Sequence, residues 1–138
     1  MEAIEITVDV LINEPIEKVW KIWNTPSDVM IWNTASEDWH TTHAEIDLKI
    51  GGKFSSRMEA KDGSLGFDFW GTYSQIEAPT FLEIFLGDGR KMSVTFSTEG
   101  NQTRVVEVFE AEAENTIELQ KLGWQAILHN FKKYVENQ

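Results

Sequence analysis

Apolar and polar residues alternate at the beginning of the chain. From Ile4 to Ile12, apolar side chains occupy every second position, and Glu5, Thr7 and Asp9 lie between them. A period of two is typical of a strand with one face in the core and one face in water. We therefore predict a first strand over residues 4–12.

A helical period of apolar residues follows this strand. Pro15 suits the first turn of a helix, because its missing N–H group would have no partner there. The next apolar residues are spaced i, i+3, i+4 and i+7, which predicts a short helix with its tryptophans facing inward: Ile16, Val19, Trp20 and Trp23. The segment from Asn24 to Ser27 ends this helix. Residues 27–32 have the polar start and apolar end of a second short helix.

The pattern changes to strand-like runs between His40 and Phe109. Turn signals divide these runs, and among them Asp62-Gly63 is a typical hairpin dipeptide. Because short connections make neighbouring strands antiparallel, this segment predicts an antiparallel sheet. Its six strands are expected over residues 43–49, 53–60, 67–76, 80–86, 91–98 and 103–111.

Residues 115–134 predict one long helix at the end of the chain. Asn115 is the candidate N-cap, and Glu118 lies three residues later, as in a capping box. Gly123 lies in the middle of the helix, where a missing side chain either lets a strand approach closely or leaves empty space. The predicted buried side consists of Leu119, Leu122, Ala126, Ile127 and Phe131.

The order of these elements predicts an α+β fold. A curved seven-stranded antiparallel sheet is expected to wrap around the long C-terminal helix, with the two short helices after the first strand. At 138 residues, the chain is expected to form a single domain over residues 1–138. One narrow helix does not fill a strongly curled sheet. The remaining space is therefore either packed with aromatic side chains or occupied by a ligand.

Four groups of residues together form a recognisable signature. They are Ile12-Asn13-Glu14-Pro15-Ile16-Glu17-Lys18-Val19-Trp20, Gly51-Gly52-Lys53-Phe54, Gly71-Thr72-Tyr73 with Ile76, and Gly123-Trp124 with Leu128 and Tyr134. These residues resemble the signature of the SRPBCC, or START-like, superfamily, and in particular proteins like the C-terminal domain of the activator of heat-shock-protein-90 ATPase. The resemblance implies a helix-grip fold, as in START and Bet v 1-like proteins, with a deep hydrophobic cavity that binds lipids, hormones or polyketides in relatives.

Composition and charge exclude several classes of protein and site. The chain has no cysteine, which rules out disulfides, thiolate catalysis and sulfur-ligated metals. Its net charge of −11 leaves no basic stripe for nucleic acid. No apolar stretch approaches the roughly 18 residues of a membrane span, and the N-terminus lacks a secretory signal. We therefore expect an acidic cytoplasmic protein.

Metal and cofactor motifs are not found in the sequence. His40 and His43 are three residues apart in an extended segment, so they are expected to point to opposite faces and not to share an ion. Phosphate-loop and dinucleotide motifs are absent. We expect neither a metal nor a cofactor.

Two charged residues are candidates for a polar anchor inside the cavity. Arg90 is in phase with the apolar residues that begin at Met92. The alternation around Glu107 does not decide which face is buried. If Glu107 faces inward it can pair with Arg90, because an unpaired buried charge is costly. The alternative is a solvent-exposed strand end, and Arg57 and Glu59 pose the same question with the surface favoured.

The other candidates are large apolar side chains, each of which either packs in the core or contacts a ligand. Trp32 and Trp39 flank a polar loop over residues 33–38 that could gate the cavity. No catalytic residue is identified. The predicted ligand-binding residues are Trp32, Trp39, Phe54, Met58, Phe69, Tyr73, Phe85, Arg90, Met92, Glu107, Trp124 and Leu128.

Three functional hypotheses follow, and the fold alone does not choose between them. The leading one is a protein that binds an unidentified small apolar or amphipathic molecule between the sheet and the C-terminal helix. The resemblance implies a second, a module that binds a chaperone or another protein partner through its acidic surface. The third is an enzyme of the cyclase or hydrolase kind that uses a polar pair in the cavity.

Overall fold

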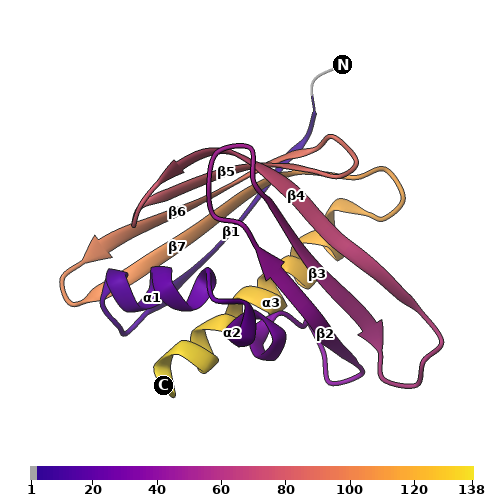
Figure 1. The fold of residues 1–138 in the computed structure, drawn as a ribbon, viewed down its shortest axis with the longest axis horizontal. Coiled ribbons are helices and arrows are strands. Elements are labelled where there is room, and N and C mark those ends of the chain that lie inside the picture. Colours follow the sequence, from indigo (N-terminus) through magenta and orange to yellow (C-terminus); the bar gives the residue numbers. More distant parts are fainter. Residues whose placement is uncertain (1–2) are drawn as a thin grey trace.

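Seven strands and three helices make up residues 3–138, the part of the chain that this computed structural model describes. The predicted α+β order is confirmed (Figure 1). A single domain over residues 1–138 stays a prediction, and residues 1 and 2 lie outside the described part. The elements are β1 (Glu5–Ile12), α1 (Ile16–Trp23), α2 (Pro26–Trp32), β2 (Trp39–Ile46), β3 (Lys53–Ala60), β4 (Gly66–Glu77), β5 (Phe81–Leu86), β6 (Lys91–Glu99), β7 (Gln102–Glu110) and α3 (Ile117–Glu136).

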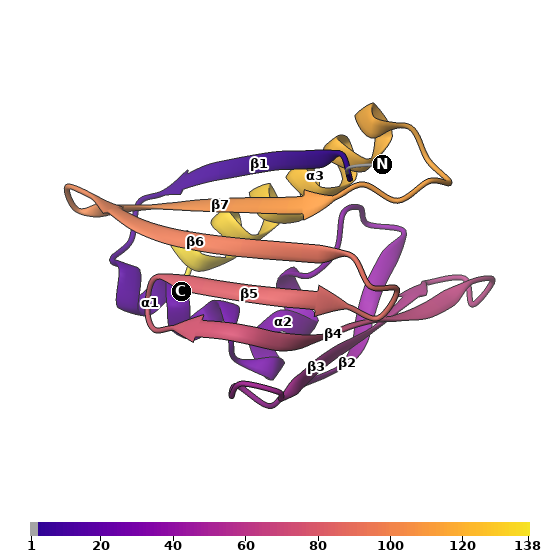
Figure 2. The ribbon, with the colours of Figure 1, turned by 90° about the horizontal axis from the view of Figure 1, so that it is seen from above.

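The seven strands form one antiparallel sheet in the order β1-β7-β6-β5-β4-β3-β2. Strands β2 to β6 each pair with the next strand along the chain, and β1 pairs with β7 at one edge (Figure 2). The register places Val8 of β1 and Val94 of β6 on either side of Glu107 in β7. Glu107 is thus surrounded within the sheet by apolar residues.

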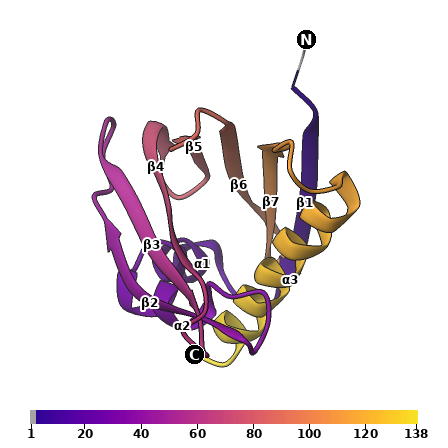
Figure 3. The same ribbon diagram turned by 90° about the vertical axis from the view of Figure 1, so that its right-hand side faces the viewer.

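The curled sheet and the long helix have the predicted helix-grip arrangement. In Figure 3 the strands form a U, in which α3 lies beside β1 and the strands β2 and β3 form the opposite wall. The helix packs against β1, α1 and α2. The two short helices lie at one end of the space between α3 and the far wall (Figures 1 and 3).

Aromatic rings fill the end of the curled sheet where α1 and α2 lie. The ring centroid of Trp23 is 4.9 Å from those of Trp32 and Phe131, and the Trp32 and Phe131 centroids are 4.7 Å apart. Asn130 of α3 donates a hydrogen bond of 2.8 Å to the Trp32 carbonyl oxygen. These contacts hold both short helices against α3. At this end, the space inside the curled sheet is therefore packed with aromatic side chains.

Strand β2 begins and ends earlier than the predicted range of residues 43–49. It runs from Trp39 to Ile46, because Trp39 pairs with Ala60 and extends the β2–β3 hairpin by four residues at its start. Backbone hydrogen bonds between Asp47 and Lys49 and between Lys49 and Gly52 form the turn that ends it. Aromatic and β-branched residues such as those from Trp39 onward favour strands, but the predicted strand left out residues 39–42.

The buried side of α3 differs from the predicted one. Leu119 and Leu122 are 57% and 69% exposed, whereas Gln120, Leu128, Phe131 and Val135 are buried. At about 100° per residue, Leu122 lies about 180° around the helix from Phe131. The prediction therefore combined residues from two faces, and packing of the larger C-terminal residues selects the face that includes Phe131.

The N-cap of α3 is Thr116 rather than Asn115. The Thr116 hydroxyl oxygen accepts a hydrogen bond of 3.1 Å from the backbone N–H of Leu119. Asn115 instead lies in the connection, where its carbonyl oxygen accepts from the Gln120 side chain. The predicted capping box is therefore wrong, because Glu118 is only two residues after the true N-cap.

This cap gives a first test of the fold. We expect Thr116→Ala to lower the free energy of unfolding by about 1 kcal/mol, because a backbone N–H of the first turn loses its acceptor. The matched Asn115→Ala variant should change it by less than about 0.5 kcal/mol, because the hydrogen bonds of Asn115 to Gln120 and Glu112 that involve its backbone are kept. Urea unfolding followed by circular dichroism measures both, and equal losses would contradict the assignment.

Candidate functional site

A cavity of about 740 Å³ lies between α3 and the inner face of the sheet. This volume is within the range of sites that hold drug-sized molecules. Most of its wall is apolar, and ten of the 27 lining residues are polar or charged. The residues that line it are Trp23, Asn24, Val29, Trp32, Asn33, Ala35, Ser36, Trp39, Ile46, Phe54, Ser56, Met58, Phe67, Phe69, Tyr73, Ile84, Arg90, Met92, Glu107, Glu112, Glu114, Asn115, Leu119, Gln120, Gly123, Trp124 and Ile127.

An aromatic wall connects α3 to the sheet across this cavity. Trp124 stacks on Phe109 with ring centroids 3.8 Å apart, and its edge meets Phe69 at 5.9 Å. Phe54 continues the row, with its centroid 5.6 Å from that of Phe69 and 5.9 Å from that of Tyr73. Burial, followed by the nearby Asp47 charge, raises the pKa of Tyr73, so its phenol stays neutral. The wall therefore offers ring faces and edges without a charge.

Ten of the twelve predicted ligand-binding residues line the cavity. They are Trp32, Trp39, Phe54, Met58, Phe69, Tyr73, Arg90, Met92, Glu107 and Trp124. Their role in binding stays a prediction.

Phe85 and Leu128 do not line the cavity, which corrects their predicted placement. Leu82, Ile84 and Leu86 of β5 are buried, so the alternation of the strand turns Phe85 to the outer face, where it is 45% exposed. Leu128 is fully buried in the packed core.

Gly123 faces open space at the cavity wall. A Cβ atom built on this residue would meet no atom within 4 Å beyond its chain neighbours and the backbone of its own helix. Of the two predicted reasons for a glycine here, close approach of a strand is therefore excluded, and empty space is what the structure shows. A side chain at this position would project into room that the wild-type chain leaves free.

Glu107 brings a carboxyl group to the inner face of the sheet. The phase of β7 that the pattern left open is now clear, because Thr103, Val105, Glu107 and Phe109 are all buried. Only 5% of Glu107 is exposed, and it lies on the cavity wall. Burial raises the pKa of Glu107 to about 8. At neutral pH this carboxyl group is therefore mostly protonated.

Arg90 does not pair with Glu107, so the predicted ion pair is wrong. Its Nε lies 2.7 Å from Asp88 Oδ2, and its Nη1 donates a 3.0 Å hydrogen bond to the Glu110 carbonyl oxygen. Asp88 and Arg90 belong to the turn between β5 and β6, and Gly89 between them has a φ of +92°. This turn holds the guanidinium at the edge of the cavity, where nearer acceptors than Glu107 engage it.

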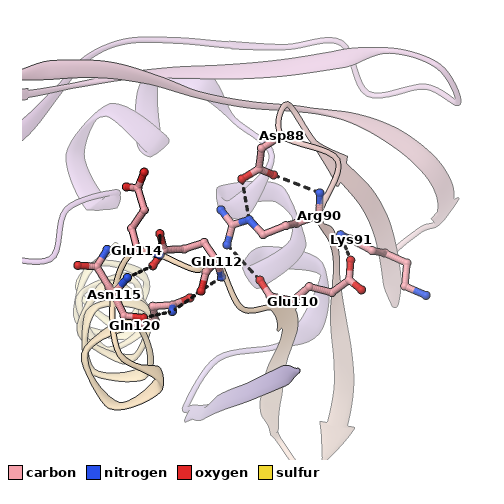
Figure 4. A network of polar contacts seen from close by, with 8 residues as sticks. All are labelled: Asp88, Arg90, Lys91, Glu110, Glu112, Glu114, Asn115 and Gln120. Carbon is pink, nitrogen blue, oxygen red and sulfur yellow. Dashed lines mark hydrogen bonds and ion pairs between the residues drawn. The ribbon is translucent and has the colours of Figure 1, made fainter. Parts of the chain in front are cut away.

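A polar network builds the mouth of the cavity beside Arg90 (Figure 4). Gln120 Nε2 donates to the carbonyl oxygens of Glu112 and Asn115, at 3.1 and 2.9 Å, and its Oε1 accepts from the Glu112 N–H. The Glu112 carboxylate in turn accepts from the N–H groups of Glu114 and Asn115. The network fixes the connection from β7 to α3, which carries two carboxylates of the cavity wall, Glu112 and Glu114.

Sequence reasoning missed the polar residues of this mouth. Gln120 is buried on the core side of α3, but it was not among the residues predicted to form the buried side of this helix. At the other end of the cavity, beside α1 and α2, Asn24 Oδ1 and Trp32 Nε1 are sealed from solvent and have no hydrogen-bond partner among residues 3–138. The signal for Gln120 was its spacing from Trp124, Ile127 and Phe131, which follows one helical stripe.

The other polar candidates lie outside the cavity. Arg57 pairs with Glu59 at 3.0 Å and also approaches Asp68, and all three side chains are well exposed. The pair is therefore at the surface, as the sequence favoured.

His40 and His43 are both exposed. A β-bulge between Thr41 and His43 shifts the register, so the predicted opposite orientation is wrong. Within residues 3–138, no group of three or more His, Asp or Glu residues could hold a metal ion.

Comparison with known proteins identifies a family and close structural relatives. The family model described as Activator of Hsp90 ATPase homolog 1-like protein matches residues 13–136. The solution structure of an AHSA1-like protein from Aeromonas hydrophila is 48% identical, with 97% of this chain and 93% of that chain covered and a TM-score of 0.91. A protein from Cytophaga hutchinsonii is 50% identical, with 96% and 92% covered and a TM-score of 0.84.

More distant likeness concerns the fold alone. A protein from Nitrosomonas europaea is 14% identical over 96% of this chain and 94% of that chain, with a TM-score of 0.81. A search of curated proteins gave no match. None of the helices in the described residues has the length and apolar character to cross a membrane.

Proposed function

The chain belongs to the family of Activator of Hsp90 ATPase homolog 1-like proteins, and from this premise we propose that it binds a small apolar or amphipathic molecule in the cavity between α3 and the sheet. The family and fold support a ligand- or partner-binding module in general. The observation that carries the finer proposal is the open space at Gly123, inside a cavity whose wall is largely apolar and includes eight aromatic residues. Burial of apolar surface away from water is the usual driving force for binding small molecules in such a cavity.

The alternatives have less support. The enzyme hypothesis depended on a charged pair in the cavity, and Arg90 engages Asp88 and the Glu110 carbonyl instead of Glu107. The protein-partner hypothesis has the support of the family description, which names an activator of an ATPase. The volume and wall of the cavity favour the small molecule.

Titration with 1-decanol or 2-naphthol tests the proposed function by NMR. Trp39 and Trp124 line the cavity, whereas Trp70 does not and lies under the Lys53 ammonium group. We expect saturable shifts of the indole N–H signals of Trp39 and Trp124, because the ligand enters beside their rings. The Trp70 signal should stay in place and serves as an internal control. No saturable shift with either probe, or an equal shift of Trp70, would contradict the proposal.

A further inference from the structure

Glu107 is a buried carboxyl group without a hydrogen-bond partner. It is the one acidic residue that is buried among residues 3–138, and no described residue donates a hydrogen bond to its carboxyl group. Its neighbours across the sheet are Val8 and Val94, and Val105 and Phe109 lie on the same face of β7. A carboxyl group in such surroundings is costly for the folded protein. A valine or leucine would complete this face without that cost, so the carboxyl group requires another explanation.

The carboxyl group of Glu107 is available to a molecule in the cavity. Glu107 lines the cavity and retains a small exposed surface there. It differs in this respect from Trp32 Nε1 and Asn24 Oδ1, which are sealed from solvent. A ligand can therefore satisfy Glu107 without rearrangement of the protein, which makes it the natural polar contact of the site.

The charges of the cavity wall favour a cation over an anion. The titratable side chains on this wall are Tyr73, Arg90, Glu107, Glu112 and Glu114. The single guanidinium is already bound to Asp88 and to the Glu110 carbonyl oxygen, and Tyr73 stays neutral. Three carboxyl groups therefore face one engaged cation, in a chain whose net charge is −11. Such a field attracts cations and repels anions.

The aromatic wall suits the same class of ligand. The rings of Phe69 and Trp124 meet edge to face beside Phe109, which is two residues from Glu107. Aromatic faces attract ammonium groups as well as apolar chains. A carboxyl group with aromatic rings nearby is an arrangement that holds an ammonium head and its apolar body together.

We propose that the cavity selects organic cations, in which an ammonium group attached to an apolar body binds the carboxyl group of Glu107. The proposal rests on the proposed function and names the chemical class of its ligand. An alcohol would give Glu107 one hydrogen bond but no opposite charge, and a carboxylate would face a group of its own charge once Glu107 is ionised. The ammonium supplies several donors and the opposite charge, so it is the best complement of the three.

Three probes with the same chain length test this selection. Binding of n-decylamine, 1-decanol and decanoate is measured by isothermal titration calorimetry at pH 8.5, below the concentrations at which they form micelles. We expect n-decylamine to bind at least about tenfold more tightly than 1-decanol, because its bond to Glu107 is charge-assisted, and decanoate to bind most weakly. Glu107→Gln should weaken n-decylamine by about tenfold and change 1-decanol by less than about threefold.

Glu5→Gln is the matched control for charge. Glu5 lies at the exposed start of β1, outside the cavity, and its substitution removes the same formal charge. We expect it to leave the affinity for n-decylamine unchanged. If both variants weaken n-decylamine equally, the attraction comes from the overall charge and the role of Glu107 is refuted.

Proton release gives a second readout that needs no variant. At pH 6.5 an ammonium bound to Glu107 should displace the carboxyl proton, so the heat of binding should depend on the ionisation enthalpy of the buffer. At pH 8.5 and in Glu107→Gln this dependence should be much smaller. Buffer-independent heats at pH 6.5 would overturn the proposal, even if Glu107→Gln failed to fold.

The results separate this inference from the proposed function. If 1-decanol binds and n-decylamine binds no more tightly, selection of cations is refuted while binding of amphipathic molecules stands. If none of the three probes binds, both are refuted. Tight binding of n-decylamine that depends on Glu107 supports both.

Discussion

The free energy of unfolding should fall as the pH rises from about 5 to about 8. Burial raises the pKa of Glu107 from 4.5 to about 8 in the folded protein. Below pH 4.5 both states hold the proton. Between the two pKa values the unfolded chain loses the proton and the folded protein keeps it, so each increase in pH favours unfolding. At about 1.4 kcal/mol per unit of pKa shift, the total loss is on the order of 3 to 5 kcal/mol.

Glu107→Gln should remove most of this pH dependence, because its amide does not titrate. Urea unfolding at several pH values between 5 and 8.5 measures the effect for the wild type and the variant. Glu5→Gln is again the matched control, because Glu5 is exposed and the variant lowers the general repulsion among the acidic residues by the same one charge. Glu107 still titrates in this variant, so its pH dependence should stay close to that of the wild type. A wild-type stability that is constant over this range, or one that falls equally in Glu107→Gln, would show that the Glu107 carboxyl group is not buried as described.

Gly123→Leu should weaken binding of 1-decanol strongly while the protein stays fully folded. A Cβ atom at this position meets no atom within 4 Å beyond its chain neighbours and the backbone of its own helix, and Gly123 lines the cavity, so we expect a leucine side chain to extend into it. There it would occupy the space that the ligand needs, and we expect the affinity to fall by at least about tenfold. Replacement of a helical glycine also raises stability by roughly 0.5 to 1 kcal/mol. Calorimetric titration and urea unfolding measure the two effects.

Gly123→Ala separates helix propensity from occupation of the cavity. It should provide the same gain in stability, because alanine restricts the unfolded chain and favours the helix. Its single methyl group leaves most of the cavity free, so the affinity for 1-decanol should change little. If Gly123→Leu instead lowers stability by roughly 1 to 3 kcal/mol, overpacking of a filled core is the cause and the cavity is refuted.

The fold could be predicted closely from local patterns, because each element has a clear period. The alternation from Ile6 to Ile12 and the turn signals at Asp62-Gly63 and Gly87-Asp88-Gly89 indicate the strands and their antiparallel order. The start of β2 was missed because it depends on pairing of Trp39 with Ala60, a contact across a hairpin. The N-cap of α3 was displaced by one residue because two adjacent residues, Asn115 and Thr116, both have capping side chains.

The candidate site was predicted in its apolar part and less well in its polar part. Large apolar residues on the inner phase of β3, β4 and β6 face the cavity because strand alternation leaves them no other direction. Phe85 was misplaced because β5 offered apolar residues in both phases. The partner of Arg90 could not be predicted, because the choice between Glu107 and the nearer Asp88 depends on the conformation of the turn at Gly89.

The order of the elements, the family resemblance and most of the inward apolar residues could be read from the chain, because they depend on periods and motifs within short segments. That Gly123 faces open space and that Glu107 is buried without a partner became clear from the folded structure. Both properties depend on how far α3 stands from the sheet and on which face of the helix packs against it. That distance results from the packing of Phe131, Trp32 and Trp23 at the end of the sheet where α1 and α2 lie. Contacts between segments about 100 residues apart leave no local pattern in the chain.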